Sequence, residues 1–313
     1  MKKILITGAR GFLGTRLLEL APSLLEARWQ GIDREEGDLC DAAAAMRLVD
    51  EIQPDQVVHL AGLIGQPADA AGRERMRSVN VEATRNLLAA LESRATGTGK
   101  IARFVLASSG LVYGAQPGPW HEDLPLLASD PYASSKREAE ALVADAASRG
   151  RVQGLVLRPA LIYGPAQLGG MFMPSLVAAL ASGREFPMTA GEQRRDYLHV
   201  DDLVQAVAAA LRLDHLPGGE GRPWTVNVGT GIGKTLLEIG GVARDLARGL
   251  WEDAGTVAPG RIPYRPDESW DYRLDSTRLR EATGWTPSVE LEDGIRQCLE
   301  AARARLATGK TSP

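Results

Sequence analysis

The first twenty residues join a short apolar run to a glycine-rich turn and then to a helical pattern. This order constrains the fold more than any other feature of the chain. Lys3-Ile4-Leu5-Ile6-Thr7 is a β-branched run typical of a buried strand. Gly8, Gly11 and Gly14 follow at once, and leucines at helical spacing come after them. A strand, a glycine turn and a helix in this order predict the first unit of a parallel β-α-β fold.

The glycine turn predicts a dinucleotide site. Gly8 permits the tight turn, Gly11 lets the backbone approach a diphosphate, and Gly14 lets the helix pack close to the strand. The diphosphate would lie at the helix N-terminus, where free N–H groups and the helix dipole favour an anion. The residues of this turn that we expect to bind the cofactor are Gly8, Arg10, Gly11, Phe12, Leu13 and Gly14.

Charged residues near the next strand bear on the choice between NAD and NADP. Asp33 follows that strand, about twenty residues past the glycines, where a carboxylate accepts the ribose hydroxyls of NAD. Arg10 and Arg34 could instead bind the 2′-phosphate of NADP, or they could be solvated surface arginines. We favour NAD, with NADP as the alternative.

Strand and helix patterns alternate through the first half of the chain. This alternation predicts an α/β fold with a Rossmann-type doubly wound parallel sheet. Past Gly164, prolines punctuate shorter elements, which indicates a smaller C-terminal substrate-binding lobe. We expect a dinucleotide-binding domain over residues 1–165, with residues 196–230 returning to it. Residues 166–313 would form mainly the substrate-binding lobe.

A tyrosine and a lysine at helical spacing predict acid–base chemistry. Tyr132 and Lys136 share one face of a helix, and a strand ending in Ser108-Ser109 precedes them. A free tyrosine has a pKa of about 10, and a neighbouring ammonium should lower that pKa. Ser109 can then hold a substrate oxygen while Tyr132 moves its proton, as the interconversion of an alcohol and a ketone requires. Taken alone, the pair is more often an ordinary surface pair.

Composition excludes several classes of protein. The net charge of −4 gives no reason to expect a nucleic acid or a membrane surface as a partner. Cys40 and Cys298 are isolated, and the four histidines lack ligand spacing, so we expect no metal. Residues 229–235 look like a nucleotide-binding P-loop, but the spacing fails, and Thr235 is expected to cap a helix. Nothing at the start of the chain resembles a signal peptide, so we expect a cytoplasmic protein.

Together, these motifs resemble those of the extended short-chain dehydrogenase/reductase family, which includes nucleotide-sugar epimerases, dehydratases and ketoreductases. The resemblance covers nearly the whole chain in the expected order. It rests on ten segments: Thr7–Gly14, Asp38-Leu39, His59–Gly62, Asn80, Ser108–Gly114, Tyr132–Lys136, Arg158–Pro165, Arg195–Asp202, Asn227–Gly231 and Gly284–Pro287.

The resemblance implies roles for individual residues. Tyr132 would be the acid–base group, Lys136 would lower its pKa and hold the nicotinamide ribose, and Ser109 would bond the reacting oxygen. Further cofactor contacts would come from Asp38, Leu39, Leu60, Ala61, Gly62 and Asn80.

The resemblance also implies a nucleotide-sugar substrate. Arg195 and Arg265 would bind its diphosphate, for which a guanidinium suits better than an ammonium. Both could instead be structural ion-pair residues, and Arg194 could take the place of Arg195. Tyr272 would line the nucleotide site.

Departures from the family pattern bear on the reaction. The two residues after the catalytic serine, acidic in the family's 4,6-dehydratases, are Gly110 and Leu111, which argues against dehydration. The short connection from Asp33 to Asp38, together with the two nearby arginines, favours a 4-keto-sugar reductase. The alternative is a 4-epimerase that retains NAD, and a non-catalytic dinucleotide-binding sensor is a remote third. By analogy with the family we expect a homodimer.

Overall fold

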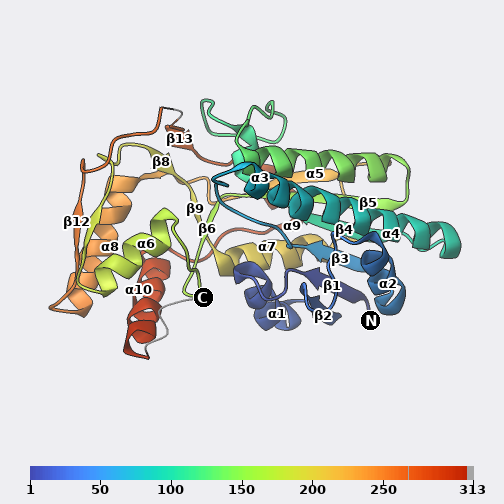
Figure 1. Cartoon of the computed structure of the whole chain (residues 1–313), viewed down its shortest axis with the longest axis horizontal. Helices are drawn as coiled ribbons and strands as arrows, with labels where there is room; N and C mark the ends of the chain where they lie inside the picture. The colour runs from blue at the N-terminus through green and yellow to red at the C-terminus, as the bar shows by residue number, and fades with distance from the viewer. Residues whose placement is uncertain (267, 309–313) are drawn as a thin grey trace.

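A six-stranded, fully parallel sheet forms the centre of the N-terminal part, as Figure 1 shows for the computed structural model. The structure describes residues 1–266 and 268–308. The strand order is β10-β5-β4-β3-β1-β2, which confirms the predicted doubly wound sheet. The strands are β1 (Lys3–Thr7), β2 (Arg28–Ile32), β3 (Gln56–His59), β4 (Ala102–Ala107), β5 (Val152–Pro159) and β10 (Trp224–Val228).

Helices cover both faces of the sheet. In Figure 1, α4 and α5 lie above it and α1 and α7 below it. Successive strand residues point to opposite faces, so Ile4 and Ile6 join one core cluster and Leu5 joins the other. The helices around the sheet are α1 (Phe12–Leu24), α2 (Ala42–Ile52), α3 (Ala70–Arg77), α4 (Ala83–Thr98), α5 (Pro131–Ser148), α7 (Val200–Arg212) and α9 (Thr277–Thr283).

The sheet has its switch point between β1 and β3. The chain moves from β1 outward to β2 and then crosses back to β3 on the other side of β1. In such sheets, ligands bind outside the carboxyl ends of the strands at the point where the order reverses. The Gly8 turn follows β1, and Leu60–Gly62 follows β3, so both predicted cofactor segments lie at this edge.

The C-terminal lobe has its own core, which lies to the left in Figure 1. Three helices form it, α6 (Phe172–Ala181), α8 (Leu236–Leu250) and α10 (Leu291–Ala307). Thr235 caps α8 with a reciprocal capping box to Glu238, which confirms the helix start predicted for the P-loop-like segment. The small strands are β6 (Leu161–Tyr163), β7 (Glu185–Pro187), β8 (Arg194–Arg195), β9 (Tyr197–His199), β11 (Lys234–Thr235), β12 (Thr256–Ala258) and β13 (Asp271–Tyr272).

Part of the second half of the chain belongs to the sheet. Strand β10 pairs with β5, and α7 packs against α1. Asp196 is fully buried and accepts hydrogen bonds from the backbone of Thr230 and Gly231, which ties the two ends of this returning segment together. Within the described residues, we find no helix that combines the length and the apolar character needed to span a membrane.

Candidate functional site

The glycine turn has the geometry of a diphosphate cradle. Gly8 has a φ of +70°, and a Cβ there would lie 2.7 Å from the backbone nitrogen of Ala61. A Cβ on Gly14 would lie 2.2 Å from the carbonyl oxygen of Gly8. No side chain caps α1 at Gly11, so the first N–H groups of the helix face the turn without an internal side-chain partner. A dinucleotide diphosphate fits such a helix start.

A cavity of about 560 Å³ extends from this turn across the carboxyl edge of the sheet. Many of the predicted cofactor residues line it, namely Gly8, Arg10, Gly11, Asp33, Arg34, Asp38, Leu39, Leu60, Ala61 and Gly62. Phe12, Leu13, Gly14 and Asn80 are not in its lining. The sequence could not show which of these residues face the cavity and which only support the backbone behind it.

The arginines beside the cavity are paired with acids. The guanidinium of Arg10 lies 2.9 Å from Glu35 and 2.7 Å from Glu36, and Arg34 lies 3.3 Å from Asp38. The two carboxylate oxygens of Asp33 accept the backbone N–H groups of Arg10 and Arg34. Exposed ion pairs of this kind are weak, but the four carboxylates outnumber the two guanidinium groups here.

Asn80 supports the site from behind. It lies in a π-helical turn, Ser78–Glu82, between α3 and α4. Its amide oxygen accepts the N–H of Leu63 at 2.7 Å, and its amide nitrogen donates to Leu63 O at 3.0 Å and to Ser135 Oγ at 2.9 Å. Asn80 thus joins the segment after β3 to α5. The sequence pattern did not predict this π-helical turn.

The predicted acid–base residues come together at the carboxyl end of β4. Tyr132 and Lys136 both lie on the buried face of α5. Lys136 Nζ donates a hydrogen bond of 2.8 Å to Ala107 O, and the chain then continues to Ser109. A Cβ on Gly62, which lines the cavity, would lie 3.3 Å from Lys136 Nζ, but Tyr132 and Lys136 are not themselves in the lining. Helix α5 begins at Pro131, where Asp130 caps it.

Burial controls the protonation of both residues. It raises the pKa of Tyr132 to about 12, although a hydrogen bond with the Ser109 hydroxyl opposes the rise. Burial lowers the pKa of Lys136 to about 8. Lys136 is not among the groups that set this pKa, since its ammonium lies 6.0 Å from the centre of the tyrosine ring and burial of the phenol dominates. The effect of Lys136 on Tyr132 therefore stays a prediction.

The predicted substrate residues are only partly brought together. Arg195, on β8, forms an ion pair with Glu268 and donates to the backbone oxygen of Ser269 at 2.6 Å. Arg265 precedes this segment and is exposed. The guanidinium of Arg194 bonds the backbone oxygen of Gly233 instead. Of the two neighbouring arginines, Arg195 is the less exposed.

Tyr272 lies in the core, so the prediction that it lines the nucleotide site is wrong. Only 2% of its surface is exposed, and it packs edge-on against Trp120. It pairs with Arg195 across β8 and β13. A Cβ on Gly110 would lie 2.5 Å from its hydroxyl. Position 110 therefore has no room for a side chain unless Tyr272 moves.

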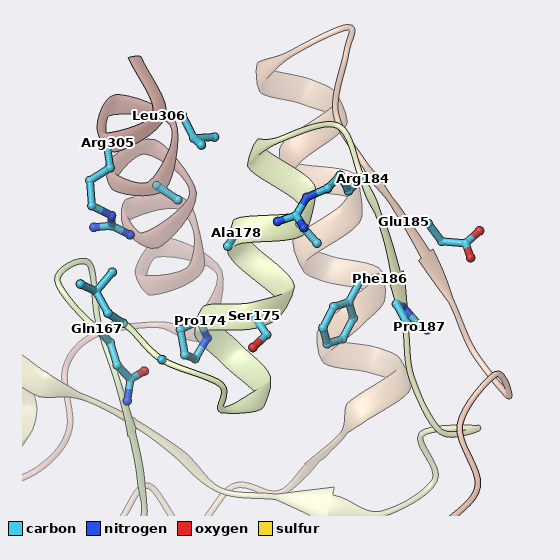
Figure 2. A pocket seen from close by; sticks show the side chains of 14 residues that line it. Gln167, Pro174, Ser175, Ala178, Arg184, Glu185, Phe186, Pro187, Arg305 and Leu306 are labelled. Carbon is cyan, nitrogen blue, oxygen red and sulfur yellow. The ribbon is translucent and has the colours of Figure 1, made fainter. Parts of the chain in front are cut away.

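A second cavity, of about 530 Å³, lies in the C-terminal lobe. Figure 2 shows Arg305 of α10 and Arg184 before β7 on opposite sides of Pro174 and Ala178 of α6. None of the predicted site residues line this cavity.

The sequence also missed several residues. Cys40, Leu63, Arg75, Ser78 and Val79 line the cofactor cavity. The basic run around Arg75 was the available signal, since Arg75 precedes the predicted Asn80 by only five positions. Among the described residues we find no group of three His, Cys, Asp or Glu side chains that could hold a metal ion.

The fold, the glycine cradle and the Ser-Tyr-Lys group define a class of dinucleotide-binding enzymes with a Rossmann-type sheet. The chain belongs to the NAD dependent epimerase/dehydratase family, whose model matches residues 4–229. This result confirms the resemblance on which the residue roles were based.

Curated relatives span nearly the whole chain. A UDP-glucose 4-epimerase of Mycolicibacterium smegmatis is 31% identical over 96% of this chain and 98% of its own length. A dTDP-glucose 4,6-dehydratase of Streptomyces griseus is 30% identical over 93% of this chain and 91% of its own length. Relatives with two different activities are thus about equally similar, so overall identity does not select one reaction.

Solved structures give the same result. RMD from Pseudomonas aeruginosa, complexed with NADPH, superposes with a TM-score of 0.80 at 27% identity, over 97% of this chain and all of that one. The UDP-glucose 4-epimerase of Thermus thermophilus, in complex with NAD, has a TM-score of 0.80 at 26% identity, over 96% of this chain and 99% of that one. Structures with either dinucleotide are therefore among the neighbours.

Proposed function

We propose that this enzyme reduces a 4-keto group of a nucleotide-activated sugar with NADH or NADPH. One observation carries the proposal. The phenol of Tyr132 is buried beside Ser109, which raises its pKa to about 12, and the next two residues, Gly110 and Leu111, are not acidic. A protonated phenol is the form that gives a proton to a carbonyl oxygen, whereas dehydration needs further acid–base groups that Gly110 and Leu111 do not supply.

The residues of this chain have distinct tasks in that reaction. Ser109 would donate a hydrogen bond to the C4 oxygen and orient it toward the Tyr132 hydroxyl. Tyr132 would then give its proton to that oxygen as negative charge develops there. Lys136 would hold the cofactor ribose and, as an ammonium, favour the resulting phenolate. Arg195 and Arg265 would bind the diphosphate.

The site residues fit a nicotinamide dinucleotide. The glycine cradle suits the diphosphate, Asp33 and Asp38 line the part of the cavity that we propose for the adenosine, and Lys136 Nζ lies close to Gly62, another lining residue. When bound, the dinucleotide supplies the hydride that reaches C4. The acids paired with Arg10 and Arg34 support NAD over NADP, because they would repel a 2′-phosphate.

A second candidate is a 4-epimerase that oxidises C4 and reduces it from the other face. The same acids favour it, since an epimerase that retains its cofactor uses NAD, and one of the two curated relatives described above is a UDP-glucose 4-epimerase. The turn between β2 and α2 argues against an epimerase. Only four residues separate Asp33 from Asp38, which leaves little chain to enclose a retained NAD.

The experiment that separates the two candidates begins with the dinucleotide released by heat-denaturing the purified protein. The protein is then assayed with NADH and NADPH on a nucleoside-diphosphate 4-keto sugar, followed by absorbance at 340 nm, and with UDP-glucose alone. Reductant consumed with the keto sugar and little bound dinucleotide support the reductase. Near-stoichiometric bound NAD with conversion of UDP-glucose to its 4-epimer would identify an epimerase. Turnover of neither substrate contradicts both.

We also propose that the enzyme forms a homodimer through α4 and α5. The apolar run Leu87–Leu91 does not supply the interface, because Leu87, Leu88 and Leu91 are buried in the core of their own chain. The contacts would have to come from the outward faces of the two helices. Light scattering on the purified protein tests this, and a monomeric mass contradicts it.

A further inference from the structure

Glu140 lies one turn beyond Lys136 on α5. Tyr132, Lys136 and Glu140 are spaced four residues apart, so they follow one face of the helix. All three are buried, and Glu140 is 8% exposed. A carboxylate at such a depth is rare unless charged or hydrogen-bonding groups surround it. The reaction described above gives Glu140 no task.

Two residues hold the Glu140 carboxylate. The hydroxyl of Ser108 donates a hydrogen bond to Oε1. Arg158, on β5, donates from Nε to Oε1 at 3.0 Å and from Nη2 to Oε2 at 2.6 Å. Arg158 is itself fixed by the Tyr113 hydroxyl at 3.0 Å. A bidentate, buried pair with its remaining donors satisfied has little freedom to move.

The Glu140 carboxylate can affect Lys136 in two ways. Ser108 stands between Ala107, whose carbonyl accepts Lys136 Nζ at 2.8 Å, and Ser109. By fixing Ser108, Glu140 fixes the strand end that receives the lysine. The second route is direct, because Glu140 and Lys136 are neighbours on the helix and carry opposite charges.

We propose that Glu140 is a positioning residue for Lys136, whose buried carboxylate keeps the lysine charged and aligned on the Ala107 carbonyl. The inference rests on the proposed function in one respect, namely that Lys136 holds the cofactor ribose. It goes beyond that function by assigning a task to a residue that touches neither cofactor nor substrate.

The surroundings of Lys136 explain why it needs this partner. Burial lowers the pKa of Lys136 to about 8, and the charge of Glu140 opposes that fall. The titratable groups that face Lys136 are Tyr132 and Glu140 on α5 and His59 on β3, while Arg158 on β5 is bound to Glu140. His59 is neutral, since its pKa is lowered to about 3. Without Glu140, Lys136 would lose its proton at a lower pH.

Binding of NADH by the full-length protein, measured by fluorescence between about pH 6 and pH 9, tests the proposal. Wild-type affinity should fall as pH rises through about 8, where Lys136 loses its charge. In Glu140→Gln the fall should come about one pH unit lower, so that binding is about twofold weaker than wild type at pH 7, approaches about tenfold weaker near pH 9, and matches the wild type at low pH. Lys136→Met should bind weakly without this pH dependence.

Glu138→Gln is the matched control. Glu138 lies on the same helix but is exposed and pairs with Arg77, so its variant should follow the wild type. If Glu140→Gln fails to fold because Arg158 is left unpaired, Glu140→Gln/Arg158→Met removes both charges, and the same shift is expected from it.

The proposal is overturned if the affinity of the Glu140 variant falls at the wild-type pH, or if binding weakens equally at every pH as for a purely structural defect. It is also overturned if Lys136→Met keeps the wild-type pH dependence. Because the measurement uses NADH and no sugar, lack of turnover with the keto sugar would contradict the proposed reaction without altering this result.

Discussion

Lys136 Nζ donates a hydrogen bond of 2.8 Å to the carbonyl oxygen of Ala107. Ala107 is the last residue of β4, and Ser108 and Ser109 follow it directly. This contact links the helix that carries Tyr132 to the strand end that carries Ser109. The relative placement of the two hydroxyls therefore depends on the lysine as well as on the packing of α5 against the sheet.

Tyr132→Phe should abolish turnover and leave NADH binding within about twofold of wild type. The variant removes the proton donor and keeps the ring that packs in the site, and loss of such a group costs about 10²–10⁴-fold in rate. Steady-state assays and fluorescence titration check the two parts. Tyr264→Phe, which removes the half-exposed hydroxyl that contacts Glu192, is the control and should be fully active. Unchanged turnover in Tyr132→Phe would remove Tyr132 from the mechanism.

The sequence predicted those parts of the site that depend on local spacing. The strand before Gly8, the helix after it and the shared helical face of Tyr132 and Lys136 all follow from patterns within a few residues. Such patterns survive folding because the backbone periodicity of the element sets which side chains face each other. The glycine cradle follows in the same way, since a side chain at Gly14 has no room beside Gly8.

Features that depend on distant contacts were not predictable. Tyr272 and Gly110 are 162 positions apart in the printed sequence, and only the fold brings the tyrosine hydroxyl to the place where a Gly110 side chain would stand. The rise in the pKa of Tyr132 has the same origin, because its burial comes from residues of several elements. The four-residue spacing between Tyr132 and Lys136 was predicted correctly, but burial of the phenol sets the pKa of Tyr132 more strongly than that spacing does.

Arg195→Met should raise the KM for the nucleotide sugar about tenfold or more and change kcat little. A guanidinium hydrogen bond to a charged group is worth about 1.5–3 kcal/mol, and the diphosphate is bound equally before and during the reaction. Arg194→Met is the matched control, since Arg194 is exposed and bonds Gly233 O. If Arg194→Met raises the KM and Arg195→Met does not, the two roles are reversed. Thermal melts show whether the unpaired Glu268 alters folding.

The unfolding free energy should decrease in mild acid because of His59. Its Nδ1 lies 2.7 Å from the Thr7 hydroxyl and its Nε2 lies 3.0 Å from the Thr84 hydroxyl, so both ring nitrogens of the buried histidine have neutral hydrogen-bond partners. Burial lowers the pKa of His59 to about 3, whereas the unfolded histidine has a pKa of about 6.5. The stabilisation is complete above about 6.5 and is lost as pH falls toward 3.

Urea unfolding at several pH values measures this effect. The loss between pH 6.5 and pH 5 should be about 2 kcal/mol, since each pKa unit corresponds to about 1.4 kcal/mol. His59→Gln should be less stable near neutrality but lose less on acidification. His215→Gln, at an exposed position, should keep the wild-type slope. An unchanged slope in His59→Gln contradicts the assignment.

Gly14→Ala should prevent both stable folding and NADH binding. Its Cβ would lie 2.2 Å from Gly8 O and 2.8 Å from the Cα atom of Ala9. Backbone atoms cannot rotate away as a flexible side chain can, so α1 would have to move off β1. We expect a loss of at least about 3 kcal/mol of unfolding free energy, at the upper end of overpacking effects.

Gly97→Ala is the control, because Gly97 lies within α4 and its new Cβ would meet nothing within 4 Å. That substitution should stabilise the protein by roughly 0.5–1 kcal/mol, as expected for alanine in place of a helical glycine. Thermal melts and NADH titration of both variants decide the matter, and a Gly14→Ala protein that binds NADH like the wild type would show that the cradle does not need the close approach of α1.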